Sequence, residues 1–343
     1  MTEAPTTGTA VTIAPGVQWL RLEMGGPLGF INVWALDDGD GVALVDCGLG
    51  TEATAAAWSQ AFAGPLRGRR VTRVFATHMH PDHIGMAGAL TREHDCRLWI
   101  TRLEYVTCRS LSSDTGRPAP PDGIRFYHAA GWGEPDIARY TERFGGFGQM
   151  LTPLPDSFRR IVDGESITIG EHAWQVVVGS GHSPEHACLW CPELRLLISG
   201  DQVLPRITSI VAVHPTEPEA NPLDDWMRSL ARIRAIVPDD VLVLPAHNDP
   251  FLGLHFRLDT LLDGHANGLA KLRALLAEAP GRVVDLFPAL FRRAIDETNI
   301  GMATGECLAH LNYLVAAGEV VRTVDAAGVA CYALNARAEA AAA

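Results

Sequence analysis

The stretch THMHPDHIG (residues 77–85) places three histidines and an aspartate within six positions of a 343-residue chain. It continues the apolar run VTRVFAT (71–77), which has the composition of a β-strand. In extended backbone, residues two apart face the same way, so His78 and His80 can present their imidazoles to one metal ion. The pattern therefore indicates half of a metal site at the end of a strand.

The second part of the same stretch, after Pro81, is expected to begin a helix. Pro81 suits the first turn of a helix, so Asp82 and His83 can point toward a second ion close by. Imidazole and carboxylate are ligands of Zn²⁺ and also suit iron and manganese. A histidine-rich polar loop is the plainer alternative, but it gives no reason for four metal-competent groups in six residues.

Further metal-competent side chains follow other strand-like runs. The segment GSGHSPEH (179–186) supplies His182 and, four residues later, His186. LISGD ends at Asp201, and VLVLPAH ends at His247. A carboxylate is a natural bridge between two cations, and Asp201 is placed to be one. Since all of these groups follow strands, we expect them to converge at one edge of a sheet.

The motifs H-x-H-x-D-H, G-H-S-P-x-H, S-G-D and P-A-H, in this order, resemble those of the metallo-β-lactamase-fold hydrolase superfamily. The resemblance covers roughly residues 15–255, and LVDCG around Asp46 matches an early strand-end aspartate of the family. It implies an α/β fold, an αβ/βα four-layer sandwich, with a two-metal site on one edge.

The resemblance also implies that each ion has three ligands of its own and that one carboxylate bridges them. The implied ligands are His78, His80 and His182 for the first ion, Asp82, His83 and His247 for the second, and Asp201 as the bridge. Hydroxyacylglutathione hydrolases, lactonases and related thioesterases share this set of seven. The implied cofactors are two divalent metal ions, zinc first, with iron or manganese as alternatives.

Such a site predicts hydrolysis. Two cations lower the pKa of a shared water, which supplies a bridging hydroxide at ordinary pH, and polarise the acyl oxygen under attack. Asp82 can orient the hydroxide and pass a proton to the leaving group. The expected function is therefore a binuclear metal-dependent hydrolase of an ester, thioester or lactone.

Four residues are candidates for the surroundings of the site. Asp46 either fixes a histidine tautomer or the histidine-rich loop, or it is a turn aspartate before a glycine. His186 either makes a hydrogen bond within the site or packs on a helix. Arg206 and His214 are candidates to line the pocket. Arg206 would pair with a substrate carboxylate or form a plain salt bridge.

The expected domains are a catalytic domain (12–255) and a C-terminal domain (256–335). Within the first, residues 103–160 are aromatic and punctuated by glycine and proline, which indicates a partly helical lid insertion. Its aromatic residues favour an acyl-bearing, partly apolar small-molecule substrate, unless they form a small core of their own. The C-terminal domain has a winged-helix-like pattern of three helices and two short strands, and it would buttress the site or form a homodimer contact.

Composition argues against several classes of partner. The net charge is −12 and no long cluster of basic residues is present, so a nucleic-acid partner is disfavoured. No apolar run approaches the roughly 20 residues that a membrane span requires. The N-terminal residues lack the features of a signal peptide, and the seven cysteines do not read as a disulfide framework. We therefore expect a cytoplasmic protein with no membrane partner.

Two alternative functions stay open. A nuclease of the same fold would keep the metal site but needs a basic surface to hold its substrate. A persulfide dioxygenase-like oxidoreductase would use one mononuclear iron and fewer ligands. The presence of Asp82, His83 and His247 argues against this second alternative.

Overall fold

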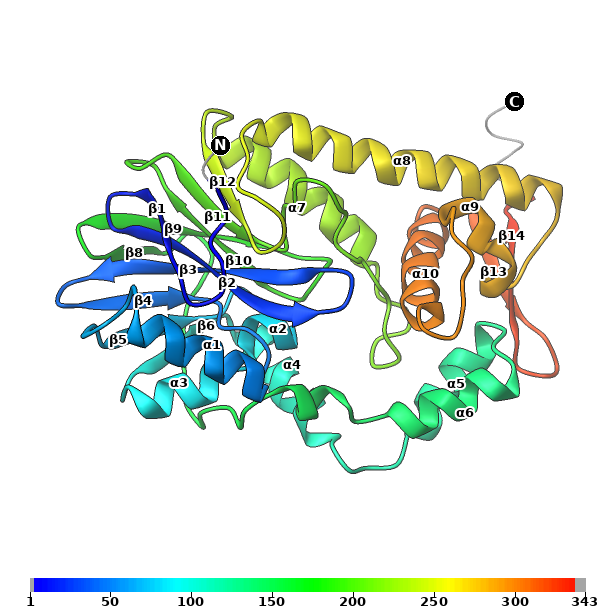
Figure 1. Cartoon of the computed structure of the whole chain (residues 1–343). Helices are drawn as coiled ribbons and strands as arrows, with labels where there is room; N and C mark the ends of the chain where they lie inside the picture. The colour runs from blue at the N-terminus through cyan, green and yellow to red at the C-terminus, as the bar shows by residue number, and fades with distance from the viewer. Residues whose placement is uncertain (1–2, 337–343) are drawn as a thin grey trace. The chain divides into compact units, whose positions relative to one another are not determined.

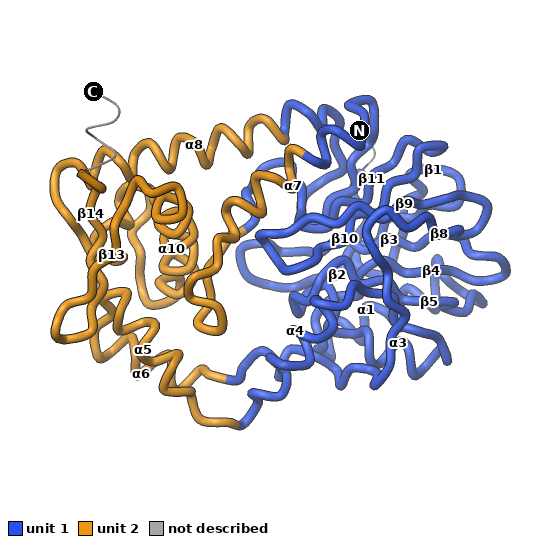
Figure 2. Tube along the Cα trace, turned by 180° about the vertical axis from the view of Figure 1, so that it is seen from behind, with its two compact units in different colours: residues 1–116, 145–209, 232–257 blue, residues 117–144, 210–231, 258–343 orange. Residues whose placement is uncertain are grey.

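The computed structural model describes residues 3–336, which form two compact units. Figure 2 shows them in different colours. Unit 1 comprises residues up to 116 together with 145–209 and 232–257, and unit 2 comprises 117–144, 210–231 and the residues from 258. The chain therefore passes between the units several times.

Unit 1 contains two β-sheets (Figure 1). The first sheet has its strands in chain order, antiparallel from β1 to β4 and parallel from β4 to β7. Its strands are β1 (Val11–Ala14), β2 (Val17–Gly25), β3 (Gly29–Asp38), β4 (Gly41–Val45), β5 (Val71–Phe75), β6 (Arg97–Ile100) and β7 (Arg159–Arg160).

The second sheet has the order β12-β11-β10-β9-β8, and only its β11–β12 pair is parallel. Its strands are β8 (Ser166–Ile169), β9 (His172–Gly179), β10 (His186–Cys191), β11 (Leu196–Gly200) and β12 (Leu242–Pro245).

Strand β3 shows how the layers form, because its apolar side chains alternate between two cores. Ile31 and Val33 belong to the core under the helices of unit 1, whereas Trp34 and Leu36 belong to the core between the two sheets. The helices below the first sheet in Figure 1 are α1 (Glu52–Ala63), α2 (Pro81–Ile84), α3 (Ala87–Glu93) and α4 (Arg102–Ser113), with the short η1 (Phe147–Met150) nearby. This layering confirms the predicted α/β sandwich.

Strand ends bring the predicted site residues to one edge of the sandwich. Asp46 follows β4, and the histidine-rich loop follows β5, which runs parallel to it. Asp201 directly follows β11, and His247 lies two residues after its parallel neighbour β12. Parallel strands end at the same edge of a sheet, so these side chains approach one another although the sequence separates them widely.

Unit 2 consists mainly of helices and one hairpin. Helix α7 (Pro222–Ile236) and the long α8 (Leu254–Glu278) each contribute residues to both units. The other elements of unit 2 are α5 (Pro121–Ala129), α6 (Glu134–Arg143), η2 (Val283–Leu286), α9 (Phe287–Leu290), α10 (Ile300–Ala316), β13 (Val320–Val324) and β14 (Ala330–Leu334). Of the helices within residues 3–336, none combines the length and apolar character needed to cross a membrane.

Part of the predicted lid packs with the C-terminal residues in unit 2. Tyr127 stacks on Trp132 with ring centroids 4.2 Å apart, and Tyr140 lies 4.7 Å from Tyr127. The Trp132 indole donates a hydrogen bond to Thr304 Oγ1 of α10 at 2.9 Å. These aromatic rings form a small core, as one of the two sequence interpretations expected. The role of the segment as a lid stays a prediction, as do the domain boundaries.

A pair of buried histidines joins α8 to α10. His310 Nδ1 lies 2.9 Å from the Glu306 carbonyl, four residues earlier, so it is the donor there. Its Nε2 can then accept a hydrogen bond from His265 Nδ1, 3.4 Å away. Within the described residues, His265 Nε2 is buried without a hydrogen-bond partner. Burial, followed by the neighbouring His310, lowers the pKa of His265 to about 4.

This pair predicts a stability loss in acid. The unfolded chain protonates His265 near its usual pKa of 6.5, whereas the folded chain resists protonation down to about pH 4. Stability should therefore fall as the pH drops from 6.5 toward 4. In His265→Phe the slope of unfolding free energy against pH between 4.5 and 6 should be shallower by up to about 1.4 kcal/mol per pH unit, one proton. Urea unfolding at several pH values measures this, and equal slopes in both proteins would contradict it.

Candidate metal centre

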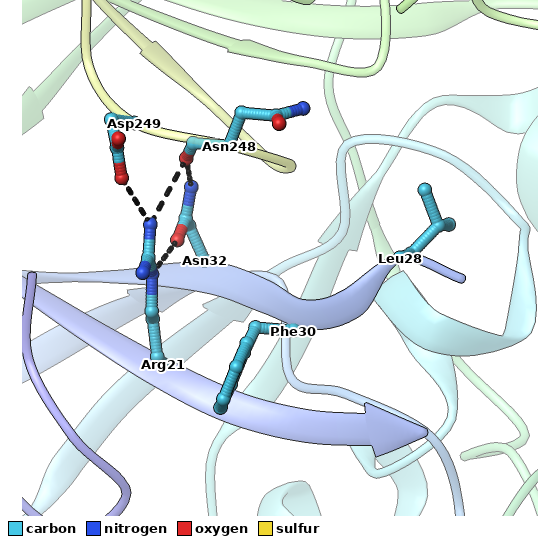
Figure 3. Close-up of a pocket in the computed structure, with 6 residues that line it drawn as sticks. All are labelled: Arg21, Leu28, Phe30, Asn32, Asn248 and Asp249. Atoms are coloured by element: carbon cyan, nitrogen blue, oxygen red, sulfur yellow. Dashed lines mark hydrogen bonds and ion pairs between the residues drawn. The ribbon is translucent and has the colours of Figure 1, made fainter. Parts of the chain in front are cut away.

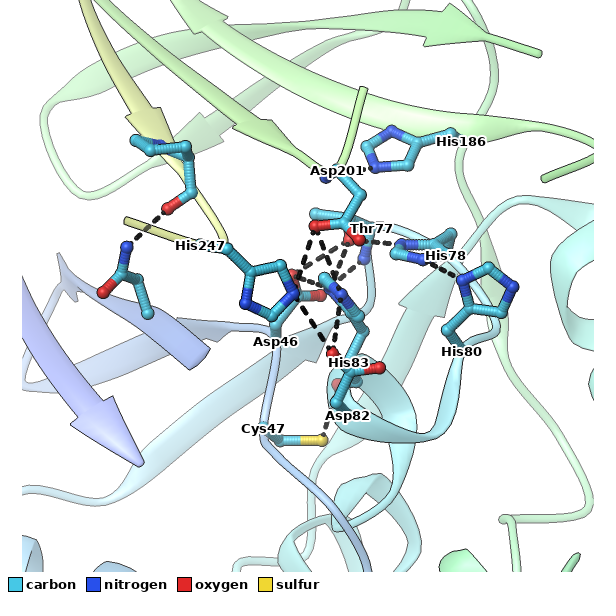
Figure 4. Close-up of polar contacts among 12 residues, drawn as sticks. Asp46, Cys47, Thr77, His78, His80, Asp82, His83, His186, Asp201 and His247 are labelled. Atoms are coloured by element: carbon cyan, nitrogen blue, oxygen red, sulfur yellow. Dashed lines mark hydrogen bonds and ion pairs between the residues drawn. The ribbon is translucent and has the colours of Figure 1, made fainter. Parts of the chain in front are cut away.

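Seven histidine and aspartate side chains converge at this edge of unit 1. Figure 4 shows six of them: His78, His80, Asp82, His83, Asp201 and His247. All seven are the predicted ligands, and three overlapping groups of three have their ligand atoms within 4.8 Å of one another. These groups are His78, His80 and His182; His78, His83 and Asp201; and Asp82, His83 and His247. We call His78, His80 and His182 the first triad, and Asp82, His83 and His247 the second triad.

The first triad comes from two loops. His78 Nε2 and His80 Nδ1 lie 2.8 Å apart, and the His182 ring is 5.0 Å from the His78 ring and 4.6 Å from the His80 ring. The expected geometry was wrong in one respect, since β5 already ends at Phe75. A bent loop, and not a continued strand, brings the two imidazoles together, because His80 is already the N-cap of α2.

The second triad has the spacing of metal ligands. Asp82 Oδ2 lies 3.4 Å from His83 Nε2 and 3.3 Å from His247 Nε2. With bonds of about 2.0–2.1 Å, the ligand atoms of a tetrahedral cation lie about 3.4 Å apart. The observed distances match that edge length.

Asp201 lies between the triads. Its Oδ1 is 3.6 Å from His83 Nε2 and 3.5 Å from His247 Nε2, whereas its Oδ2 is 3.5 Å from His182 Nε2. One carboxylate oxygen thus faces each triad. This arrangement would allow the carboxylate to bridge two cations, one at each oxygen.

The donor set fits divalent cations. Among the described residues, three buried atoms at the centre have no hydrogen-bond partner: His83 Nε2, His247 Nε2 and Asp201 Oδ1. Leaving buried polar atoms unsatisfied is costly, so their shared direction calls for a common partner. Imidazole nitrogen and carboxylate oxygen together are typical ligands of zinc and also suit iron and manganese.

Hydrogen bonds on the far side of three rings fix their tautomers. Thr77 Oγ1 has one hydrogen, which Asp46 Oδ2 accepts at 2.9 Å, so the hydroxyl oxygen accepts from His78 Nδ1 at 3.1 Å. His83 Nδ1 donates to Asp46 Oδ2 at 2.8 Å, and His247 Nδ1 donates to the Phe30 carbonyl at 3.0 Å. In the neutral form that ligates a metal ion, each ring would therefore have its lone pair on Nε2, the nitrogen on the side of the centre.

The pKa directions suit ligation by the first triad. Burial, reinforced by neighbouring imidazoles, holds the pKa of His78 well below its usual value and lowers the pKa of His80 to about 3. Both rings are therefore neutral at physiological pH. A neutral imidazole is the form that binds a metal ion.

The second half of the centre is rich in negative charge. Burial alone would raise the pKa of Asp82 and Asp201, but His83 and the neighbouring imidazoles outweigh it and hold both below the usual value. Burial alone would lower the pKa of His83, but Asp82, Asp46 and Asp201 raise it well above its usual value. Three carboxylates around one imidazole attract a positive charge, which a cation at Nε2 would supply.

Both interpretations of Asp46 apply. It has a positive φ of 63°, so it is a turn residue at the end of β4. It also accepts hydrogen bonds from the Thr77 amide at 2.8 Å and from His83 Nδ1, and it is buried. The strained turn therefore aims the carboxylate at the loop that carries the histidines.

His186 is the first residue of β10, and its ring stacks on that of His78 with the centroids 4.8 Å apart. Its Nε2 accepts a hydrogen bond from the Asp201 amide at 3.0 Å. The backbone between them leaves no room for a larger residue, because a Cβ atom on Gly200 would lie 2.5 Å from His186 Nε2. His186 thus supports the turn that presents Asp201.

The two remaining candidates lie on the surface. Arg206 is exposed, and its Nη2 lies 4.0 Å from Asp249 Oδ2, which matches the plain salt-bridge interpretation. His214 is exposed and belongs to unit 2. A role for either in a substrate pocket stays a prediction.

A small pocket of about 210 Å³ lies beside the His247 loop (Figure 3). At its base Asn32 donates to the carbonyls of Pro245 at 2.9 Å and Asn248 at 2.6 Å. Arg21 directs its donors at Asn32, Asn248 and Asp249. These contacts connect β2 and β3 to the loop that presents His247. They also occupy donors of the Arg21 guanidinium that an anionic ligand would otherwise use.

The sequence interpretation missed three residues that hold the ligands: Asn32, Thr77 and Glu104. Asn32 had a signal, as the one amide within the apolar run FINVWAL of β3. Thr77 directly precedes His78. Glu104 is an acidic residue in the first turn of α4, which is too common a position to mark a function.

Comparison with known proteins agrees with this geometry. Residues 26–247 match the family model described as metallo-beta-lactamase superfamily, and residues 269–335 match one described as metallo-beta-lactamase-like, C-terminal domain. A hydroxyacylglutathione hydrolase from Rhizobium etli is 22% identical over 218 residues, which are 63% of this chain and 64% of that protein. The chain thus spans somewhat less than two thirds of that relative.

Two solved structures resemble nearly the whole chain. A beta-lactamase domain protein from Burkholderia ambifaria is 37% identical with a TM-score of 0.89, covering 97% of this chain and 96% of that one. A metallo-beta-lactamase family protein from Thermus thermophilus is 26% identical with a TM-score of 0.79, covering 94% of this chain and 100% of that one. Because the family model matches residues 26–247 and two solved structures match nearly the whole chain, the chain belongs to the metallo-beta-lactamase superfamily.

Proposed function

We propose that the chain is a binuclear metal-dependent hydrolase that cleaves an ester, thioester or lactone bond. The observation that carries the proposal is the orientation of Asp201, whose two oxygens face two separate triads of ligand atoms. The likeness to a protein named hydroxyacylglutathione hydrolase supports acyl-bond cleavage. Membership of a family of metal hydrolases agrees with both.

The bound cations would supply a water of lowered pKa and polarise the acyl oxygen. The protein residues would do the rest. Asp82 has a partly exposed side chain, and its low pKa keeps it ionised, so it can accept a hydrogen bond from the attacking water and orient it. It would then relay the proton of that water to the leaving group. Asp46 and the Phe30 carbonyl hold His83 and His247 in place meanwhile.

The proposed substrate is a small acyl-bearing molecule of partly apolar character. Leu28 and Phe30 present exposed apolar surface next to the carbonyl that holds His247, with exposed fractions of 45% and 38%. The net charge of −12 opposes a nucleic-acid substrate. A mononuclear iron enzyme would leave the second triad without a purpose.

Metal analysis combined with a substrate panel tests this proposal. Purified protein should contain two divalent ions per chain and hydrolyse at least one class among p-nitrophenyl esters, thioesters and lactones. A fluorescent RNA should stay intact over a series of salt concentrations. One iron per chain would favour the dioxygenase instead, and RNA cleavage that weakens with salt would favour the nuclease.

Replacement of the bridging carboxylate should remove both metal and activity. In Asp201→Ala both metal ions would lose a ligand. Metal affinity should therefore fall by more than the roughly 10–100-fold loss that is typical when a residue hydrogen-bonded to a ligand is replaced. His172→Ala is the control, because His172 pairs with Glu193 at the surface away from the centre. It should keep both metal content and turnover. Wild-type turnover in Asp201→Ala would refute the site.

Loss of the Asp46 charge should weaken binding while all seven ligands remain. Asp46→Asn gives up the carboxylate that accepts from His83 Nδ1, so the affinity for the second ion should fall about 10–100-fold. Competition with a chromophoric chelator measures that affinity. Asp38→Asn, which alters a carboxylate bound to Thr72 and Arg73 instead, should bind like the wild type. Equal affinities in all three proteins would show that Asp46 is only a turn residue.

A further inference from the structure

Glu104 is a fully buried carboxylate that belongs to neither triad. It lies in the first turn of α4, and its relative exposure is 0%. Its Oε2 accepts a hydrogen bond from the Met79 amide at 2.9 Å. Its Oε1 accepts from Ser183 Oγ at 2.6 Å and from the Glu185 amide at 2.7 Å. A buried charge must be matched by such contacts, and here all of them come from outside the helix.

The contacts of Glu104 fall on two loops. Met79 lies between His78 and His80, and Ser183 directly follows His182. The two loops therefore carry all three members of the first triad. The separate oxygens of one carboxylate hold one loop each, so Glu104 fixes their distance from one another.

The start of α4 reinforces the second loop. Thr101 Oγ1 donates to the Glu185 carbonyl at 2.8 Å, and the Leu103 amide donates to the Glu185 carboxylate at 2.8 Å. The segment after His182 is thus bound to α4 at several points. The second triad has different supports, since Asp46 holds His83 and the Phe30 carbonyl holds His247.

We propose that Glu104 is a positioning residue for the first metal ion, acting by clamping the His78–His80 loop to the His182 loop. This inference rests on the proposed binuclear function, because it assigns a support to one half of that centre. It requires that loss of the carboxylate weaken the first ion and spare the second. A merely structural role would lower stability without that selectivity.

The experiment uses the full chain, stripped of metal and titrated with Zn²⁺ against a chromophoric chelator. His182→Ala and His247→Ala identify which binding step belongs to the first and second triad. In Glu104→Ala the first step should weaken about 10–100-fold, and the second should stay within about threefold of wild type. Glu104→Gln keeps the size of the side chain and one acceptor oxygen, so its affinity in the first step should lie between those of Glu104→Ala and the wild type.

Two further variants keep the test decisive. Ser183→Ala removes a single hydrogen bond, so it should fold and weaken only the first step, by less than Glu104→Ala. Asp38→Asn is the matched control, because Asp38 also accepts several hydrogen bonds but holds Thr72, Arg73 and Gly170. It should leave both steps unchanged even where its melting temperature falls.

Hydrogen exchange on the metal-free protein gives a readout that does not depend on metal. The amides of Met79 and Glu185 should exchange faster in Glu104→Ala and unchanged in Asp38→Asn. Unaltered binding, or equal weakening of both steps, would overturn the clamp. If wild-type protein binds no metal, the proposed function fails, and the exchange result alone then decides whether Glu104 holds the loops.

Discussion

The centre depends on one constraint, which is that three carboxylates, two buried and one partly exposed, lie close together among imidazoles. Asp46, Asp82 and Asp201 surround His83, and each would be costly to bury alone. The imidazoles keep Asp82 and Asp201 ionised, and the carboxylates in turn raise the pKa of His83. Each charged group thus offsets part of the cost of burying its neighbours, and a hydrogen bond on the far side of each ring fixes His78, His83 and His247.

Local motifs revealed the ligands and two of their supports, Asp46 and His186, but not Asn32, Thr77 or Glu104. The seven candidate ligands could be found because each follows a strand, and strand ends meet at one edge. Glu104 could not be found in this way, because its partner Ser183 is 79 positions away. Asn32 contacts Pro245 across 213 positions. Only the folded topology brings these residues together, so the sequence pattern carries little trace of them.

Local patterns also failed where backbone conformation matters. The period-two reasoning for His78 and His80 gave the correct pairing for the wrong reason, since a bend replaces the expected strand. The aromatic residues of 117–144 do pack together, but the sequence did not show that they join the C-terminal helices in unit 2.

The hydrogen bonds of Asn32 bear on how the chain is made. During synthesis, its amide group cannot form these hydrogen bonds until Pro245 and Asn248 have been made, more than two hundred residues later. At an elongation rate of about 5–20 residues per second, that interval lasts on the order of ten to forty seconds. Within this interval, between the synthesis of His80 and that of Asp201, the nascent chain contains His78 and His80 but lacks Asp201 and His247. A cation captured then would meet an incomplete set of donors.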